Sequence, residues 1–312
     1  MKNTTLRQLR VFSEAARQQS FAQAAASLHL TPPAISMQIK ELEEQVGLPL
    51  FERSGRKVQL TAAGEYVLVY ARRILAAVKE ADDAVARLRE VEAGQLVIGM
   101  VSTAQYFLPM MLAQFRAEHP GVDIKLAVGN RASLVELLKA GELDIAVMGR
   151  PPKELATSAE PFAKQPHVFV GQPAHPLVAQ GRRARLAPQR LAGHPFIMRE
   201  SGSGTRASLE NFCAETGLAP QVVMEMSSNE TIKQAVMAGM GLSFLSLHTI
   251  GTELRHQLLA VVRVKGCPVM RDWHCVHTLE RVLSPAAEAF RQFMLQRGEA
   301  FLEQEFGHLL GP

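Results

Sequence analysis

Cysteine is scarce in this chain, and its pattern argues against a disulfide framework. The 312 residues contain three cysteines, Cys213, Cys267 and Cys275, without a CxxC pair. An odd set of this kind is typical of buried thiols in a reducing compartment. A metal site near Cys275 is the alternative, but Cys275 and His277 fall on one face of an expected strand and His274 on the other, with no evident fourth ligand. We therefore predict no metal and no resident cofactor.

Long apolar runs are also missing. No stretch reaches the roughly 18 consecutive apolar residues that span a bilayer, and the N-terminus shows no apolar signal core. We expect a cytoplasmic protein without a membrane partner. Hydrophobic residues still make up 47% of the chain, and 312 residues exceed what one core usually spans. More than one domain is therefore expected.

The motifs of common enzymes are absent as well. The sequence contains neither the GxxxxGK[ST] of a phosphate-binding loop nor the GxSxG of a nucleophile elbow. No Ser/His/Asp or Cys/His set has a suitable spacing. An α/β catalytic unit at residues 94–312 is the alternative that these absences weaken. We predict that the protein is not an enzyme.

The segment from residue 20 to 42, SFAQAAASLHLTPPAISMQIKEL, has the pattern of a helix-turn-helix. Small and apolar residues recur at helical spacing in its first part, and residues 29–31 break the run. Thr31 can cap a second helix whose first positions are Pro32 and Pro33. One stripe of this helix would face a core: Ile35, Ile39, Leu42 and Val46.

The opposite face of this second helix suits a DNA major groove. An amphipathic hairpin without a nucleic-acid role is the alternative. Residues 1–60 hold eight Lys or Arg against five Asp or Glu, and a basic loop follows the helix. We therefore predict DNA binding, with Thr31, Ser36 and Gln38 near base edges and the cations, Lys57 included, on phosphates. The predicted DNA-binding residues are Thr31, Pro33, Ser36, Gln38, Lys40, Arg53 and Arg56.

Two features complete the N-terminal part. Gly, Pro and Ser-Gly between residues 46 and 60 favour a short two-stranded wing. Residues 61–92 then predict one long helix, because residues 65–92 contain no Gly or Pro and carry a mostly apolar stripe. Its stripe would pack against the same helix of a second copy, which makes it a linker and dimerisation helix. A solvent-exposed amphipathic helix is the alternative.

After residue 93 the sequence alternates short apolar runs with helical segments. Runs such as LVIGMV and LDIAVMG are apolar on both faces, as buried parallel strands are. The predicted class is therefore α/β with crossover helices. A last helix should begin at Pro285 and end at about Leu310.

One segment of this second part predicts an anion site. Ser201, Gly202, Ser203, Gly204, Thr205 and Arg206 follow an expected strand and open a helix. Free amides and hydroxyls at a helix N-terminus, with a guanidinium, favour a carboxylate or phosphate. Ser102 and Thr103 stand in the same position after the first strand. Ordinary capping by Ser and Thr is the alternative.

The whole chain resembles a LysR-type transcriptional regulator. The matching segments are LRQLRVFSEAARQQSFAQAAASLHLTPPAISMQIKELEEQVGLPLFER, SGRKVQLTAAGE and QLVIGM. The resemblance implies a winged helix-turn-helix at 1–60, a linker helix at 61–92 and a two-lobe effector domain at 93–312, similar to periplasmic binding proteins. Lobe one would comprise residues 94–163 and 268–312, and lobe two residues 164–267. Asn130, Arg131 and Asn229 would line the cleft between the lobes.

The effector half most resembles activators of carbon-fixation genes. VDIKLAVGNRASLVELLKAGELDIAVMGRPP, FIMRESGSGTRASLENF and MSSNETIKQAVMAGMGLSFLSLHTI carry this likeness. It implies a homotetramer on double-stranded promoter DNA and a small anionic effector: a sugar phosphate, phosphoenolpyruvate or NADPH. RNA polymerase is left open as a further partner. A regulator of another metabolic operon and a thiol-based redox sensor are the alternatives.

Overall fold

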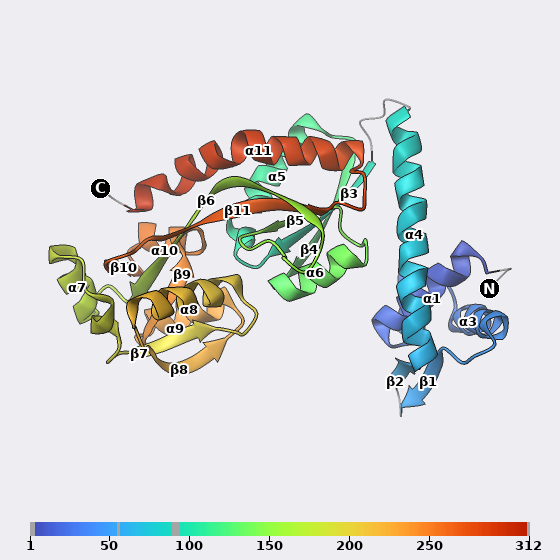
Figure 1. Ribbon diagram of the computed structural model, residues 1–312, viewed down its shortest axis with the longest axis horizontal. Helices are drawn as coiled ribbons and strands as arrows, with labels where there is room; N and C mark the ends of the chain where they lie inside the picture. Colours follow the sequence, from blue (N-terminus) through green and yellow to red (C-terminus); the bar gives the residue numbers. More distant parts are fainter. Residues whose placement is uncertain (1–3, 55–56, 89–93, 311–312) are drawn as a thin grey trace. The chain divides into compact units, whose positions relative to one another are not determined.

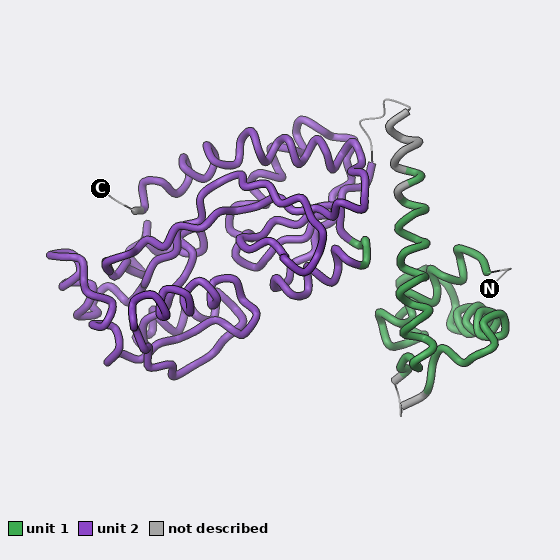
Figure 2. Tube along the Cα trace, viewed as in Figure 1, with its two compact units in different colours: residues 1–89, 140–142 green, residues 90–139, 143–312 purple. Residues whose placement is uncertain are grey.

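The computed structural model describes residues 4–54, 57–88 and 94–310 (Figure 1). The chain divides into two compact units, residues 1–89 with 140–142 and residues 90–139 with 143–312 (Figure 2). Each unit has its own apolar core.

The first unit is a winged helix-turn-helix followed by a long helix. Its elements are α1 (Leu6–Gln18), α2 (Phe21–Ser27), α3 (Pro32–Val46), the antiparallel hairpin of β1 (Phe51–Ser54) and β2 (Lys57–Leu60), and α4 (Ala62–Leu88). The apolar stripe of α3 faces the core as the sequence predicts, since Ile35, Ile39 and Leu42 are buried. Phe12 on α1 and Ala71 on α4 pack into the same cluster.

Caps set the ends of these helices. The hydroxyl of Ser20 accepts from the backbone N–H of Gln23, which starts α2, and Gly47 ends α3 with a φ of 80°. Thr31 is the N-cap residue of α3, but its side chain makes no capping hydrogen bond. Prolines at the first two helical positions leave fewer amide donors to cap, so the predicted cap is wrong in this respect.

The carboxylate of Glu43 on α3 attaches the wing, formed by β1 and β2, to this helix. Glu43 Oε1 accepts from the backbone N–H of Leu50 at 2.7 Å and of Phe51 at 3.2 Å. A Cβ at Gly64 would lie 2.1 Å from the carbonyl oxygen of Leu50. Glycine therefore allows the first turn of α4 to approach the chain that leads into β1.

The second unit is built on one mixed sheet. Its strands are β3 (Gly94–Val101), β4 (Val122–Gly129), β5 (Ile145–Met148), β6 (Thr157–Gly171), β7 (Pro195–Arg199), β8 (Gln221–Met226), β9 (Leu242–Ser246), β10 (Ala260–Val262) and β11 (Val269–Thr278). The order is β4-β3-β5-β11-β6-β9-β7-β8, with β10 beside β6. Parallel pairs occur within β3, β4, β5 and within β7, β8, β9.

The two long strands β6 and β11 pair antiparallel and join these parallel groups (Figure 1). The sequence marks a strand within each of these segments, but it does not reveal their length or their antiparallel pairing. β11 pairs with β6 along its whole length, from Val269 opposite His167 to Thr278 opposite Thr157, and the last residues of β6 pair with β9 and β10 instead.

We call the two groups the first and second lobes. The first lobe contains β3–β5 with η1 (Ala104–Tyr106), α5 (Leu108–Glu118), α6 (Arg131–Lys139), α11 (Pro285–Phe306) and η4 (Gly307–Leu310). The second contains β7–β10 with α7 (Pro176–Arg183), η2 (Pro188–Leu191), α8 (Gly204–Thr216), α9 (Asn229–Met237), η3 (Leu247–Ile250) and α10 (Gly251–Arg255). Phe115 and Phe290 meet edge to face in one core, and Phe169 and Phe212 do so in the other.

Two further observations concern membranes and metals. No helix within the described ranges is long and apolar enough to cross a membrane. In the same part of the chain, no three His, Cys, Asp or Glu side chains converge as a metal site would require. Cys275 lies buried on β11 instead, in the first lobe's core.

Candidate functional site

The outer face of α3 is open and polar. Thr31, Pro33, Ser36 and Lys40 are exposed, and Gln38 is half-buried, where its amide donates to Glu41 Oε2 at 3.1 Å. Lys40 is 78% exposed, and its ammonium lies 3.9 Å from Glu44. Thr31, Pro33, Ser36 and Lys40 are therefore accessible, whereas Gln38 lies beside the buried stripe of α3.

The structure describes the predicted cations of the wing only in part. Arg53 lies in β1 opposite Val58, and Lys57 opens β2, but their side chains lie outside the described residues. Arg56 lies outside them entirely.

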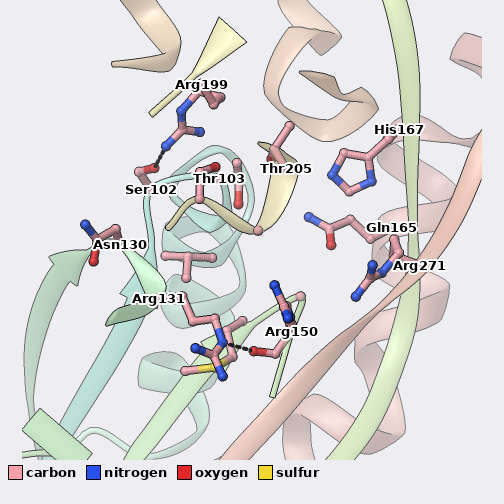
Figure 3. Close-up of a pocket in the computed structure, with 15 residues that line it drawn as sticks. Ser102, Thr103, Asn130, Arg131, Arg150, Gln165, His167, Arg199, Thr205 and Arg271 are labelled. Atoms are coloured by element: carbon pink, nitrogen blue, oxygen red, sulfur yellow. Dashed lines mark hydrogen bonds between the residues drawn. The ribbon is translucent and has the colours of Figure 1, made fainter. Parts of the chain in front are cut away.

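A second candidate site lies where the parallel strands of both lobes end (Figure 3). Ser102 and Thr103 follow β3, Asn130 and Arg131 follow β4, and Arg150 follows β5. Ser203, Gly204 and Thr205, from the start of α8, line the same pocket. The carboxyl ends of parallel strands are the usual ligand position in open α/β sheets.

Arg199 at the end of β7 joins the lobes at this site. Its Nη2 donates to Ser102 Oγ at 3.4 Å and its Nη1 to Asn229 Oδ1 at 2.6 Å (Figure 3 shows the former). Glu200 holds the same guanidinium through two hydrogen bonds of 2.7 and 2.9 Å. Arg199 is 4% exposed, so Glu200 balances a buried charge.

Two further arginines approach the pocket from the first lobe. Arg131 donates to the carbonyl oxygen of Arg150 at 3.0 Å and pairs with Glu154 at 3.0 Å. That contact lowers the pKa of Glu154 to about 2. The Arg150 side chain forms no ion pair with any residue that the structure describes.

The crossover strands supply the remaining polar groups. Gln165 and His167 alternate along β6, and Arg271 on β11 lies opposite Gln165. His167 is 2% exposed, and burial first and Arg271 second lower its pKa from 6.5 to about 3. Across the ranges that the structure covers, Arg271 has no carboxylate partner.

The lining as a whole is cationic. It includes Arg131, Arg150, Arg199 and Arg271 and, among the described residues, no Asp or Glu. Glu154 and Glu200, just outside the lining, pair with Arg131 and Arg199, so the excess positive charge comes from Arg150 and Arg271. One sign of charge in a concave, partly buried site attracts an ion of the opposite sign. The free volume of this pocket is about 30 Å³, room for about two or three water molecules at roughly 10–15 Å³ each. A larger anion therefore requires the lobes or the side chains to move.

Most of the residues predicted from sequence come together here. Ser102, Thr103, Asn130, Arg131, Ser203, Gly204 and Thr205 line the pocket. Asn229, 2% exposed, lies at its edge, where it contacts Arg199 and Ser102. Ser201 and Gly202 are exposed and lie outside the lining.

Arg206 belongs to the predicted anion site, but it does not line the pocket. Its Nε donates to Glu210 at 2.8 Å, one turn along α8, and its Nη1 contacts Glu225 on β8. Two carboxylates within reach draw the guanidinium away from the pocket. Arg206 therefore holds α8 to β8, and Arg199 supplies the buried guanidinium instead.

Gln165, His167, Arg199 and Arg271 also line the pocket and were not predicted from the sequence. A signal exists for Arg199, because a cation ends an otherwise apolar strand, FIMR. No local signal exists for the others, since only the antiparallel pairing of β6 with β11 brings them to the pocket.

Both parts of the chain match models of one protein family. Residues 6–65 match the model of the bacterial regulatory helix-turn-helix proteins of the lysR family, and residues 89–299 match the LysR substrate binding domain. The chain is 47% identical to the HTH-type transcriptional regulator CfxR of Cupriavidus necator over 99% of this chain and 97% of that protein.

Two other similar proteins are informative. The RuBisCO operon transcriptional regulator of Allochromatium vinosum is 44% identical over 94% of this chain and 96% of its own. The regulatory domain of CcmR from Synechocystis, solved in complex with 2-PG, is 31% identical with a TM-score of 0.62, covering 65% of this chain and 96% of that one. The predicted resemblance to carbon-fixation regulators is thus confirmed.

Proposed function

We propose, from the premise that this chain belongs to the LysR family of transcriptional regulators, that it activates carbon-fixation genes when a small anion binds between its lobes. The chain is a DNA-binding regulator and not an enzyme, as its family and its full-length relatives establish. The observation that supports an anionic effector is the lining of the pocket, which contains four arginines and, among the described residues, no carboxylate. The relatives that are named RuBisCO operon regulators support the target genes.

The effector belongs to the class of sugar phosphates, phosphoenolpyruvate or NADPH. A phosphate group suits paired guanidiniums because its oxygens accept two parallel hydrogen bonds. The CcmR domain that was solved with 2-PG supports an anion in this cleft. Ser102, Thr103, Asn130, Arg131, Ser203, Gly204, Thr205 and Asn229 are the proposed contacts, with Arg199 added. Ser201, Gly202 and Arg206 position the α8 loop.

The assembly is a homotetramer built from dimers. The outer stripe of α4 exposes Tyr66, Val69, Tyr70 and Ile74 in the single chain, at 73%, 52%, 50% and 39%. A second copy of α4 would cover this stripe. Two recognition helices then read half-sites about 34–36 Å apart. We assign residues 1–60 to DNA binding, 61–92 to dimerisation and 93–312 to the effector, all working in the cytoplasm.

The contact between the two lobes suggests how a ligand could switch the regulator between two arrangements. Arg199 spans the lobes through Ser102, and a ligand larger than the pocket must change this arrangement. Only a difference in ligand affinity between the two arrangements can shift their populations. That difference is what promoter DNA would sense.

Fluorescence anisotropy with a duplex from upstream of the carbon-fixation operon tests this function. We expect tight, specific binding that shifts with ribulose bisphosphate, phosphoenolpyruvate or NADPH. Tight binding that none of them changes would favour the regulator of another operon. Loss of preference for this duplex over random DNA would reject the target.

Variants of α3 separate base contacts from phosphate contacts. Ser36→Ala should weaken binding to the specific duplex more than to random DNA. Lys40→Ala should weaken both and reduce the salt slope by about one. Lys139→Ala, an exposed lysine of α6 in the effector unit, is the matched control. Equal loss on all DNA for Ser36→Ala would argue against base reading.

A further inference from the structure

We propose that His167 selects, among the anions that enter the cleft, those that carry a hydroxyl group, by accepting a hydrogen bond at Nδ1. The inference rests on the proposed function, because it assigns a role within the same pocket. It concerns a specificity-determining residue of the effector site rather than the anion contacts themselves.

The first observation is an unpartnered atom in the pocket wall. His167 lines the pocket, yet its Nδ1 is buried and has no hydrogen-bond partner among the described residues. Its ring stacks on Phe244, with centroids 5.5 Å apart and planes 13° from parallel. This stacking restricts the tilt of the ring, and buried polar atoms rarely stay unpaired without a reason.

The second observation is the protonation state of the ring. Arg271 on β11, His248 from the second lobe and the backbone of Gln165 are the polar and charged groups that act on His167, and Phe244 covers one face. Burial and Arg271 hold its pKa at about 3, so the imidazole is neutral near pH 7. A neutral imidazole has one N–H and one lone pair, and the proposal places the lone pair on the unpartnered Nδ1.

A neutral acceptor beside guanidiniums has a specific use. Nδ1 repels the oxygens of an anion but accepts from a hydroxyl. Figure 3 shows Gln165, His167 and Arg271 on one side of the pocket and the Ser102–Arg199 pair on the other, with Arg150 between. Arg150 and Arg271, which no carboxylate of the described residues neutralises, would hold the anion, and a hydroxyl on its carbon chain would meet His167.

Two probes that differ in one hydroxyl test this role. Calorimetry on the full chain at pH 7.5 would compare 3-phosphoglycerate with 3-phosphopropionate, which keeps both anionic groups and lacks the hydroxyl. We expect wild type to bind 3-phosphoglycerate about tenfold more tightly than this second probe, the phosphate ester of 3-hydroxypropionate. His167→Phe, which keeps the ring on Phe244, should bind both probes about equally. His167→Gln, which restores an acceptor, should recover part of the preference, and the exposed His256→Phe should retain all of it.

The outcomes distinguish this inference from the proposed function. Equal binding of the two probes to wild type, or an unchanged preference in His167→Phe, overturns the role of His167 and leaves the anion cleft standing. Binding of neither probe overturns the role of His167, and the anisotropy titrations with ribulose bisphosphate, phosphoenolpyruvate and NADPH decide the anion cleft separately. If His167→Phe does not fold, His167→Gln decides, because a preference near that of wild type supports the acceptor and none rejects it.

Discussion

The hydroxyl of Tyr106 in the first lobe donates to Glu230 Oε1 in the second lobe over 2.6 Å. Lys233 completes this contact: its ammonium pairs with Glu230 at 2.7 Å and lies 4.6 Å from the centre of the Tyr106 ring. Burial and Glu230 raise the pKa of Tyr106, which keeps the hydroxyl protonated as a donor. The contact therefore favours the closed arrangement of the lobes.

Removing that hydroxyl should strengthen effector binding. Tyr106→Phe keeps the ring on Lys233 but loses an exposed hydrogen bond to a carboxylate, worth up to about 1 kcal/mol. Because a ligand larger than the pocket must change the present arrangement of the lobes, its affinity should rise by up to about fivefold. Calorimetry with the effector measures this, and Tyr70→Phe on α4 is the control. An affinity equal to that of wild type would exclude a role for the contact in closure.

Arg199 and Arg206 should behave differently when neutralised. Arg199→Gln removes a buried guanidinium from the pocket and leaves Glu200 without its partner, so effector affinity should fall at least about tenfold. Arg206→Gln breaks exposed pairs with Glu210 and Glu225 and should change affinity less than about twofold. Titration of both variants with the effector checks this. A larger loss of affinity in Arg206→Gln would mean that Arg206 contacts the ligand.

The wing should depend on Glu43. Glu43→Ala leaves the buried amides of Leu50 and Phe51 without an acceptor, which costs about 1–3 kcal/mol. Hydrogen exchange at these two amides should accelerate, and DNA affinity should fall. Glu44→Ala, which removes an exposed carboxylate one position along α3, is the control. Unchanged protection in Glu43→Ala would show that water replaces the carboxylate.

Stability should fall as pH drops from about 6.5 to 4. Burial lowers the pKa of His167 to about 3 and of His248 to about 4, below the usual 6.5. The unfolded chain then binds more protons in this window, so each histidine contributes stability that is complete above pH 6.5 and lost below it. Protonated His248 would also lose the hydrogen bond from Trp273 Nε1, at 3.0 Å.

Urea unfolding followed by fluorescence of Trp273 measures this dependence, since the chain has one tryptophan. His167→Phe should make the decline shallower by up to about 1.4 kcal/mol per pH unit, the value for one proton. The exposed His256→Phe should keep the slope of wild type. An equal slope in His167→Phe would mean that His167 is already protonated.

The three thiols should resist mild oxidation. Burial raises the pKa of Cys267 to about 12 and also raises the pKa of Cys213 and Cys275, so little thiolate exists near pH 7. After mild peroxide, we expect the number of free thiols and the promoter affinity to be unchanged. Thiol counting on the denatured protein is the control. Loss of one thiol with a change in DNA affinity would favour the redox sensor.

Local sequence patterns predicted the buried side of α3, the ends of several elements and some residues of the pocket. The spacing of Ile35, Ile39 and Leu42 sets which side of α3 is buried, because a helix repeats every 3.6 residues. Prolines and glycines mark where elements begin and end. Ser102, Asn130 and Thr205 reach the pocket because the carboxyl ends of parallel strands meet at one edge.

Side-chain partners that are distant in sequence were beyond these patterns. Arg206 faces Glu225 and Arg199 faces Ser102, separations of 19 and 97 residues. A sequence does not reveal which of two nearby arginines finds a carboxylate first, since both satisfy the same local pattern.

The sequence by itself determined that this chain is a winged helix-turn-helix regulator with an α/β effector part. Helix periodicity, helix caps and strand hydrophobicity each depend on residues that lie close together along the chain, so the sequence reveals them. Only the tertiary structure decided the chemistry of the cleft, where His167 and Arg271 come together from strands more than one hundred residues apart. Burial then altered the pKa of His167, and burial is a property of the folded molecule alone.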